Sequence, residues 1–380
     1  QPAALTANET LAADLAFTQY DGTEADSVEM PTLGAKNGLT LASMIGKDFD
    51  DPEWDTLLDQ LTYSEMVNTI TLGFHNTAAA ASIGKTATKD ENGPQGLTAA
   101  LTGGASAMCY TSEDVMAATF NVDLINEVGR CIGEDCLAMG YSGLYGPGIN
   151  MHRTAYSGRN FEYYSEDGVL SGAMAANAIA GAQEHGVYAY MKHFALNDQE
   201  GNRNCMVATW SNEQAIREIY LKPFEMSVKD ADCHAVMSSF NYIGNRWAGG
   251  CSELLQNVLR GEWGFLGFVE TDYFGVYGYM TADQAVRNGG DLMLCTTGND
   301  YNNVTVLTNS SKQAMRTSAK NILYTVVNSR AYEAENLNPG MAKWKVILIG
   351  ADVVAALLIV GLEYTAIKNY KKRKEEEEEV

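Results

Sequence analysis

The chain has 380 residues, of which 46% are hydrophobic and only 7 are proline, a composition that excludes a disordered protein and suits one large domain with an appendage. Its net charge of −22 repels phosphate backbones, so we expect no nucleic-acid partner. The seven cysteines are scattered and include no C-x-x-C pair. We therefore expect neither a disulfide scaffold nor a metal site, and no cofactor.

The N-terminal segment is polar, rich in Gly, Thr and Asp, and weakly periodic. This pattern is typical of a linker, so we interpret residues 1–51 as a linker that contributes no hydrophobic core. Gln1 is followed by no charged and apolar leader. The sequence is therefore expected to be a mature or truncated product.

Residues 52–335 alternate helical patterns with short apolar runs. Thr62 and Glu65 have the spacing of a capping box, apolar residues from Ile125 to Met139 mark one helical face, and Ser211 with Gln214 predicts another helix start. The runs that predict strands are Gly143–Tyr145, Val187–Met191, Ala235–Ser238, Gly267–Thr271 and Asp291–Leu294.

This alternation predicts an α/β fold, specifically a (β/α)8 TIM-like barrel of the roughly 250-residue class. A doubly wound sheet is the alternative. No G-x-G-x-x-G motif follows a strand and opens a helix, so a dinucleotide site has no support.

Polar side chains follow several of the predicted strands. Arg159 comes after the first, Lys192 and His193 after the second, and Asp272 closes the apolar run that starts at Phe265. Strand ends of a parallel barrel open onto one face, where catalytic side chains converge. Alone, Asp272 also suits a helix N-cap, and Lys192 with His193 suits a structural pair. Their shared placement favours a site.

The C-terminal region differs in kind. Val346 to Leu362 is apolar except for Asp352, and Trp344 and Tyr364 bracket it as interfacial aromatic residues would. This pattern predicts a transmembrane helix. A buried C-terminal helix is the alternative, because an Asp near the centre of a span costs about 2.5 to 3.5 kcal/mol.

We divide this region into a juxtamembrane linker at 336–345, a span at 346–364 and a charged tail at 365–380. More Lys and Arg residues follow the span than precede it. The positive-inside rule then predicts a single-pass protein of the cell membrane, with a cytoplasmic tail and an extracellular catalytic domain.

Several motifs, in order, closely resemble family 3 glycoside hydrolases of the β-glucosidase type. They lie at Gly158–Asp167, Lys192–Arg203, Arg217–Tyr220, Met237–Asn241 and Gly264–Tyr273. The resemblance covers residues 52–335. It implies retaining hydrolysis of terminal β-linked glucosyl or related residues from oligosaccharides or glycosides.

The resemblance also implies residue roles. Asp272 matches the nucleophile, and Arg159, Lys192 and His193 match residues that hydrogen-bond the sugar. Met237 and Tyr273 are the other residues expected to contact the substrate, with Tyr273 replacing a common Trp. Asn92 replaces a usual sugar-binding Asp, and Phe240 replaces a frequent Tyr. Arg153, Asp198, Glu200 and Arg203 are expected to form ion pairs that brace the loops.

Retaining hydrolysis needs a second carboxyl group. In the β-glucosidase type, this Glu comes from a separate α/β sandwich domain. The N-acetylglucosaminidase branch carries a Lys-His-Phe-Pro-Gly motif, but Phe194 is here followed by Ala195 and Leu196. Some members have the sandwich first, and residues 1–51 would then link this chain to a missing upstream domain. The alternative to an enzyme is a membrane-tethered carbohydrate-binding barrel that is catalytically incomplete.

Overall fold

The structure is a computed structural model that describes residues 28–275, 277–296, 302–305, 307–333 and 343–378. The chain divides into two compact units, Gln1–Tyr332 and Glu333–Val380. The predicted linker residues 1–27 and 336–342 lie outside the described residues.

Five parallel strands form the central sheet, hydrogen-bonded in the order β1-β2-β3-β5-β8. Their bounds are Asp90–Asn92 (β1), Gly143–Tyr145 (β2), Tyr188–Phe194 (β3), Ala235–Ser238 (β5) and Phe268–Glu270 (β8). Each strand of this sheet therefore pairs with the strand of the same sheet that follows it along the chain, as right-handed βαβ connections produce. The first four predicted strands are confirmed.

The fifth predicted strand, Asp291–Leu294, is not a regular strand. Leu292 forms one parallel bridge with Glu270, while the backbone N–H of Met293 donates to the carbonyl of Ile70 at 2.8 Å. These contacts extend the TIM-barrel-like α/β fold beyond β8. Closure into a (β/α)8 barrel stays a prediction.

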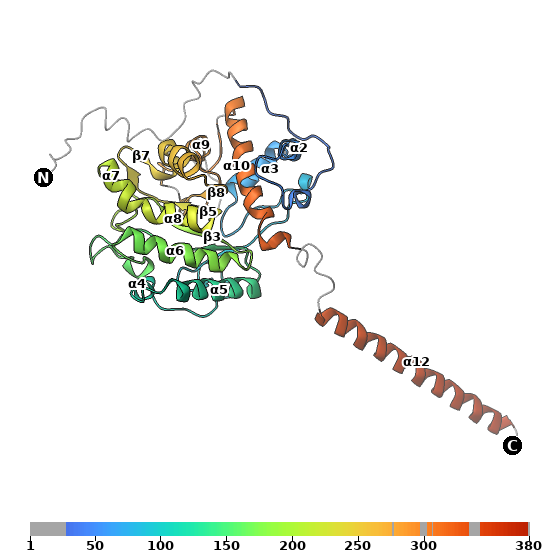
Figure 1. Ribbon diagram of the computed structural model, residues 1–380. Coiled ribbons are helices and arrows are strands. Elements are labelled where there is room, and N and C mark those ends of the chain that lie inside the picture. The colour runs from blue at the N-terminus through green and yellow to red at the C-terminus, as the bar shows by residue number, and fades with distance from the viewer. Residues whose placement is uncertain (1–27, 276, 297–301, 306, 334–342, 379–380) are drawn as a thin grey trace. The chain divides into compact units, whose positions relative to one another are not determined.

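Three helices pack side by side along the sheet (Figure 1). They are α5 (Val122–Met139), α6 (Gly168–Gln183) and α8 (Lys222–Ala231). Small residues allow α5 and α6 to approach closely: a Cβ atom on Gly129 would lie 2.2 Å from the carbonyl oxygen of Ala178. The helical face predicted between Ile125 and Met139 is buried here and is confirmed.

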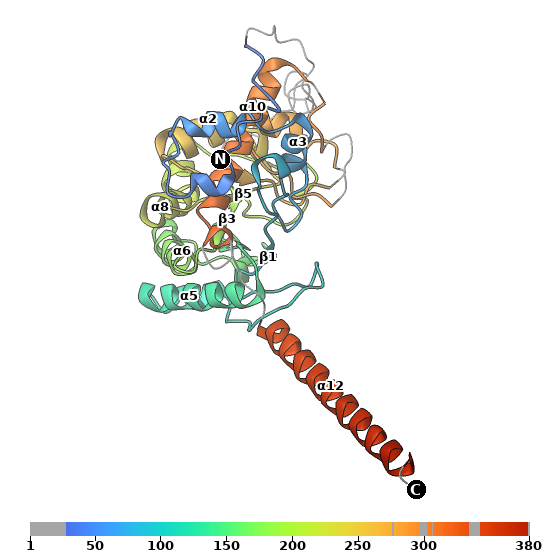
Figure 2. The ribbon, with the colours of Figure 1, turned by 90° about the vertical axis from the view of Figure 1, so that its right-hand side faces the viewer.

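A second group of helices packs around α10 (Asn309–Val327), which contacts α2 (Glu53–Leu58), α3 (Tyr63–Thr71) and α9 (Ala282–Arg287). Figure 2 shows α2, α3 and α10 on one side of β3 and β5, with α5 and α6 on the other. The predicted capping box of α3 is confirmed, because the side chains of Thr62 and Glu65 bond reciprocally to backbone N–H groups.

Shorter elements complete the first unit. The small sheet has the order β4-β6-β7, with bounds Ala208–Thr209, Tyr242–Ile243 and Arg246–Trp247. The remaining helical segments are η1 (Leu41–Met44), η2 (Ala81–Ile83), α4 (Glu113–Ala117), η3 (Asn160–Glu162), α7 (Glu213–Ala215), η4 (Ile216–Tyr220), η5 (Ala248–Gly250), η6 (Glu253–Glu262) and η7 (Arg330–Tyr332). Asn212 caps α7, so the predicted cap at Ser211 is wrong by one residue.

The expectation that residues before 52 contribute no core is also wrong. Leu41 and Met44, both in η1, are fully buried and belong to the same hydrophobic cluster as Trp54. Because they are spaced by three residues, one turn of 3₁₀ helix places both side chains on the same face.

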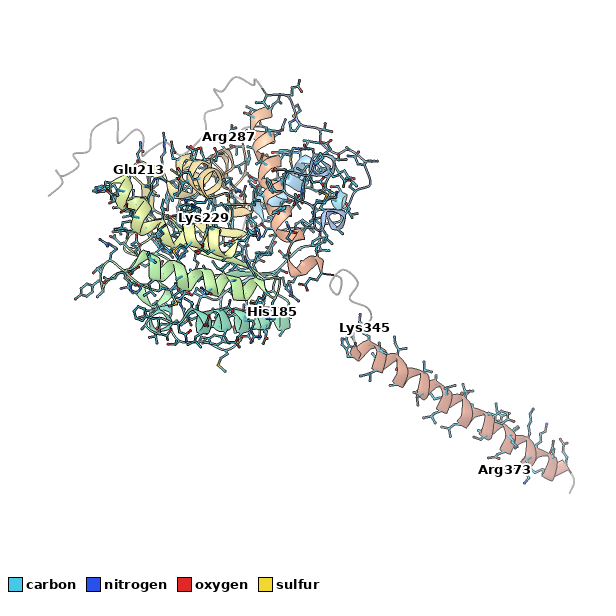
Figure 3. The ribbon with its side chains drawn as sticks, viewed as in Figure 1. His185, Glu213, Lys229, Arg287, Lys345 and Arg373 are labelled. Atoms are coloured by element: carbon cyan, nitrogen blue, oxygen red, sulfur yellow. The ribbon has the colours of Figure 1, made fainter. Side chains whose placement is uncertain are left out.

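The second unit contains α12, which runs continuously over Lys343–Glu378. Its segment Trp344–Glu375 is long and apolar enough to cross a membrane, judged by length and composition alone. Figure 3 shows Lys345 near one end of this helix and Arg373 near the other. The bounds, orientation and side of the predicted span stay predictions.

Candidate active site

All seven predicted site residues line one cavity of about 490 Å³: Asn92, Arg159, Lys192, His193, Met237, Asp272 and Tyr273. Asn92 ends β1, Lys192 and His193 lie near the end of β3, and Asp272 follows β8. The cavity therefore lies at the carboxyl ends of the parallel strands, where this architecture builds its sites. The roles of these residues stay predictions.

Asp272 is nearly buried, with 7% of its surface exposed. Its Oδ2 atom lies 3.4 Å from Nη1 of Arg203 and 3.8 Å from Nε2 of His193, and its Oδ1 accepts a hydrogen bond from the N–H of Tyr273 at 2.7 Å. Burial raises the pKa of Asp272 above its ordinary value, whereas the guanidinium groups of Arg203 and Arg159 act in the opposite direction.

A second carboxylate, Glu162, holds two cations of the cavity wall. Its Oε1 lies 2.8 Å from Nζ of Lys192, and its Oε2 lies 2.7 Å from Nη2 of Arg159. Burial alone would raise the pKa of Glu162, but these cations reverse the effect and lower it to about 2. Glu162 is therefore ionised at neutral pH and fixes the positions of both cations.

His193 is held as a neutral hydrogen-bond acceptor. Its Nε2 faces Nη2 of Arg159 at 3.1 Å, and its Nδ1 faces the hydroxyl of Tyr163 at 3.2 Å. Because a guanidinium only donates, Nε2 accepts and the proton resides on Nδ1. Burial lowers the pKa of His193 well below its ordinary value, and Arg159, Lys192 and Arg203 act in the same direction.

Glu200 braces two of the arginines, as predicted. Its Oε2 lies 2.9 Å from Nε of Arg203, and its Oε1 lies 3.4 Å from Nη1 of Arg159. Arg153 and Asp198 form no ion pair within 4 Å among the described residues, although the charge of Arg153 opposes the effect of burial, which raises the pKa of Asp198. The guanidinium of Arg153 lies over the ring of Tyr220 at 5.5 Å, and Asp198 accepts a hydrogen bond from the N–H of Met151.

Seven further residues line the cavity and were not predicted as substrate contacts: Phe74, His75, Leu101, Tyr145, Arg203, Leu294 and Thr296. Tyr145 ends β2, so its position after an apolar run could have indicated it. Arg203 was assigned only to loop bracing, although it also contacts Asp272. Leu101 lies in a loop whose direction no local pattern indicates.

Asp272 is the only carboxylate among the described residues that line the cavity. Glu270, two residues earlier, is fully buried, and the hydroxyl of Tyr145 lies 3.4 Å from its Oε1. Burial raises the pKa of Glu270 well above its ordinary value, and nearby Asp90 adds to the effect. Burial therefore favours the uncharged form of Glu270, which lies outside the described cavity lining.

The barrel-like fold with a carboxylate and fixed cations at its strand ends is of a kind that hydrolyses glycosides. Residues 74–322 match the family described as Glycosyl hydrolase family 3 N terminal domain. The chain belongs to this family, and its domain is of the β-glucosidase type.

Curated relatives and solved structures agree with this membership. The chain is 38% identical over 241 residues to a β-glucosidase of Rhizobium radiobacter, covering 63% of this chain and 29% of that protein. It is 37% identical over 245 residues to β-glucosidase B of Emericella nidulans, covering 64% of this chain and 28% of that protein. The chain thus spans less than a third of the length of these relatives.

Two solved structures have a similar fold. One is β-glucosidase 3B of Thermotoga neapolitana in complex with glucose, with a TM-score of 0.65, 31% identity, and coverage of 75% of this chain and 44% of that one. The other is a β-glucosidase of Paenibacillus barengoltzii, with a TM-score of 0.70, 27% identity, and coverage of 81% and 36%.

Proposed function

We propose that this chain carries the nucleophile and the sugar-binding cavity of a retaining glycosidase that releases terminal β-linked glucosyl or related residues from oligosaccharides or glycosides. The supporting observation is the surroundings of Asp272: it is the only carboxylate in the described cavity lining, and Arg203 lies 3.4 Å from its Oδ2. A carboxylate in this position has the charge and the access that attack on an anomeric carbon requires.

In the first step of this mechanism, an oxygen of Asp272 bonds to the anomeric carbon while the bond from that carbon to the leaving oxygen breaks. A second carboxyl group protonates the leaving oxygen. In the second step, the same group removes a proton from water, the water oxygen bonds to the anomeric carbon, and Asp272 leaves as a carboxylate.

The second carboxyl group has to lie about 5 to 5.5 Å from the nucleophile. We propose that a Glu of an α/β sandwich domain upstream of this chain supplies it. The support is that the described lining of the cavity contains no second carboxylate.

The cavity wall has the chemistry to bind a sugar ring. Arg159 and Lys192 donate hydrogen bonds to hydroxyls, and His193 keeps Arg159 in place by accepting a hydrogen bond from its guanidinium. Tyr273 and Met237 offer apolar surface to the ring, and Asn92 offers an amide where a carboxylate would bind hydroxyls more strongly. We further propose that α12 anchors the protein in the cell membrane, with the charged tail in the cytoplasm.

Trapping of the covalent intermediate tests the proposal. The full chain is incubated with 2,4-dinitrophenyl 2-deoxy-2-fluoro-β-glucoside, whose leaving group needs little protonation, and the mass of its peptides is measured. We expect one fluoroglucosyl group on the peptide that contains Asp272 and none in D272N. A catalytically incomplete carbohydrate-binding barrel is the alternative, and Asn92 together with the lack of a second carboxylate in the described cavity lining favours it. Glucose binding without an adduct, even with the sandwich domain supplied, would establish that alternative.

A further inference from the structure

A second cavity, of about 320 Å³, lies on the first unit and shares no lining residue with the candidate active site. Its described lining comes from four segments: Arg153 with Thr154, then Leu196 with Asp198 and Gln199, then β4 with Trp210 and Ser211, and finally Tyr220 at the end of η4. The first two follow β2 and β3, so this cavity belongs to the same strand-end face as the candidate active site. Its volume is at the lower end of the roughly 300 to 1,000 Å³ range of small-ligand sites.

The lining combines an exposed aromatic surface with polar groups. Trp210 is 59% exposed although it borders a concave surface, and the guanidinium of Arg153 lies over the ring of Tyr220 at 5.5 Å. The face of an exposed indole ring is apolar and readily exchanges its water for contact with another apolar surface. The edge of the ring tolerates polar neighbours. Figure 3 shows Glu213, the first residue of α7 and three residues after Trp210, at the outer surface of the unit.

The polar groups carry both signs of charge. Arg153 supplies donors, Asp198 supplies acceptors, and Gln199 supplies both. Burial raises the pKa of Asp198 to about 7, so near neutral pH its carboxyl group is available in both donor and acceptor forms. An anionic ligand would meet Asp198 and a cationic one would meet Arg153, so the lining favours a neutral molecule with many hydroxyls.

Hydrogen bonds within the fold hold several residues that line this cavity. Oδ1 of Asp198 accepts a hydrogen bond from the N–H of Met151 at 2.6 Å, and the hydroxyl of Thr209 donates to the carbonyl of Tyr242 at 2.7 Å. Leu196 has a φ of 63°, a conformation that residues with a Cβ atom adopt rarely and that is often found at functional sites. Asp198 and Thr209 are thus held in place before a ligand arrives.

We propose that this cavity is a second carbohydrate-binding site, which takes a sugar unit of a neutral β-linked oligosaccharide by stacking on Trp210 and hydrogen bonding to Asp198, Arg153 and Gln199. The site goes beyond hydrolysis at Asp272 and does not require it. It would hold an oligosaccharide chain near the cavity that contains Asp272, because His193 lies near the end of β3 and Asp198 lies in the loop that follows this strand.

Calorimetric titration of cellopentaose into the full chain tests this site. D272N is the background, so that the sugar stays intact, and excess glucose occupies the first cavity. We expect Trp210→Ala to weaken binding about fivefold to tenfold, as loss of one aromatic contact would, and Trp210→Phe to retain most of the affinity. Tyr156→Ala is the matched control, because Tyr156 is 95% exposed on the loop of Arg153 but outside the cavity lining.

Unchanged affinity in W210A, equal loss in Y156A, or no cellopentaose binding beyond the glucose-blocked cavity would overturn the second site. Labelling by the fluoroglucoside separates the two proposals. If Asp272 is labelled but W210A binds cellopentaose normally, only the second site is wrong. If binding depends on Trp210 but Asp272 is never labelled, only the proposed catalysis is wrong.

Discussion

Nη1 of Arg203 lies 3.4 Å from Oδ2 of Asp272, on the same carboxylate oxygen that lies 3.8 Å from Nε2 of His193. Arg203 is positioned from two other directions as well. Glu200 holds its Nε at 2.9 Å, and the ring of Phe240 lies 4.7 Å from its guanidinium carbon. Since His193 is neutral, Arg203 is the cation closest to the proposed nucleophile among the described ion pairs.

Replacement of Arg203 by Met should therefore raise the pKa of Asp272 further, because the largest effect that opposes burial is lost. We expect the acid limb of fluoroglucoside labelling to move to higher pH by about one pH unit, so that labelling slows by about tenfold at pH values well below the midpoint. The measurement is the labelling rate against pH. Arg217→Met is the control, because Arg217 pairs with Glu262 at the surface. Equal shifts in both variants would contradict the role of Arg203.

The unmodified chain should also lose labelling on acidification. Burial raises the pKa of Asp272 above its ordinary value of about 4, so protonation removes the nucleophile at a pH where an exposed Asp is still ionised. We expect the labelling rate to fall below a midpoint above pH 4. A rate that stays constant down to pH 4 would contradict this pKa direction.

Glu162→Gln should destabilise the fold in a pH-dependent way. The folded-state pKa of Glu162 is about 2, below its unfolded value of about 4.3, so the stability it contributes is present above about pH 4.3 and is lost as pH falls toward 2. Loss of one partner of a buried ion pair costs about 3 kcal/mol. We expect a lower Tm for E162Q at pH 7 and a smaller difference at pH 3, measured by calorimetry. A constant difference across this range would show that pairing is not the cause.

Gly129→Ala should loosen the contact between α5 and α6. The added Cβ atom would lie 2.2 Å from the carbonyl oxygen of Ala178, so one helix has to shift. Overpacking of this kind costs about 1 to 3 kcal/mol, which denaturant unfolding would detect. Gly201→Ala is the control, because its nearest neighbouring atom is 3.7 Å away. Equal stability of the two variants would show that the interface adapts.

Truncation before Trp344 should release the protein from membranes. The removed residues include nearly all of α12, whose apolar segment would otherwise enter lipid. We expect the full chain to sediment with membranes and the truncated chain to remain in the supernatant, while both keep glucose binding. A truncated chain that still sediments with membranes would exclude α12 as the anchor.

The parts of the fold that local sequence patterns specify were predictable. The runs at Gly143–Tyr145 and Ala235–Ser238 are apolar and bounded by turns, and both are strands with these bounds. β1 was missed because its residues, Asp90 to Asn92, are all polar, and Asp90 and Glu91 are buried only through contacts with distant partners. Among these partners are the hydroxyls of Tyr188 and Tyr190, each 2.6 Å from a carboxylate oxygen of Asp90.

The lining of the candidate active site could also be predicted in part, because local sequence patterns place some of its residues. Residues at strand ends, such as Lys192 and Asp272, are placed by the strand that precedes them. Residues on loops are placed by contacts that sequence spacing does not encode. Thr102 contacts the buried carboxylate of Glu91, which sets the path of the loop and brings Leu101 to the cavity.

Because Glu162 contacts both Lys192 and Arg159, the two cations are not independent elements of the cavity. The single negative charge of Glu162 is shared between them, so loss of Lys192 would leave more of it to Arg159. Substitution of either cation should therefore change the electrostatic surroundings of the other, and the three residues act as one coupled unit of the cavity wall.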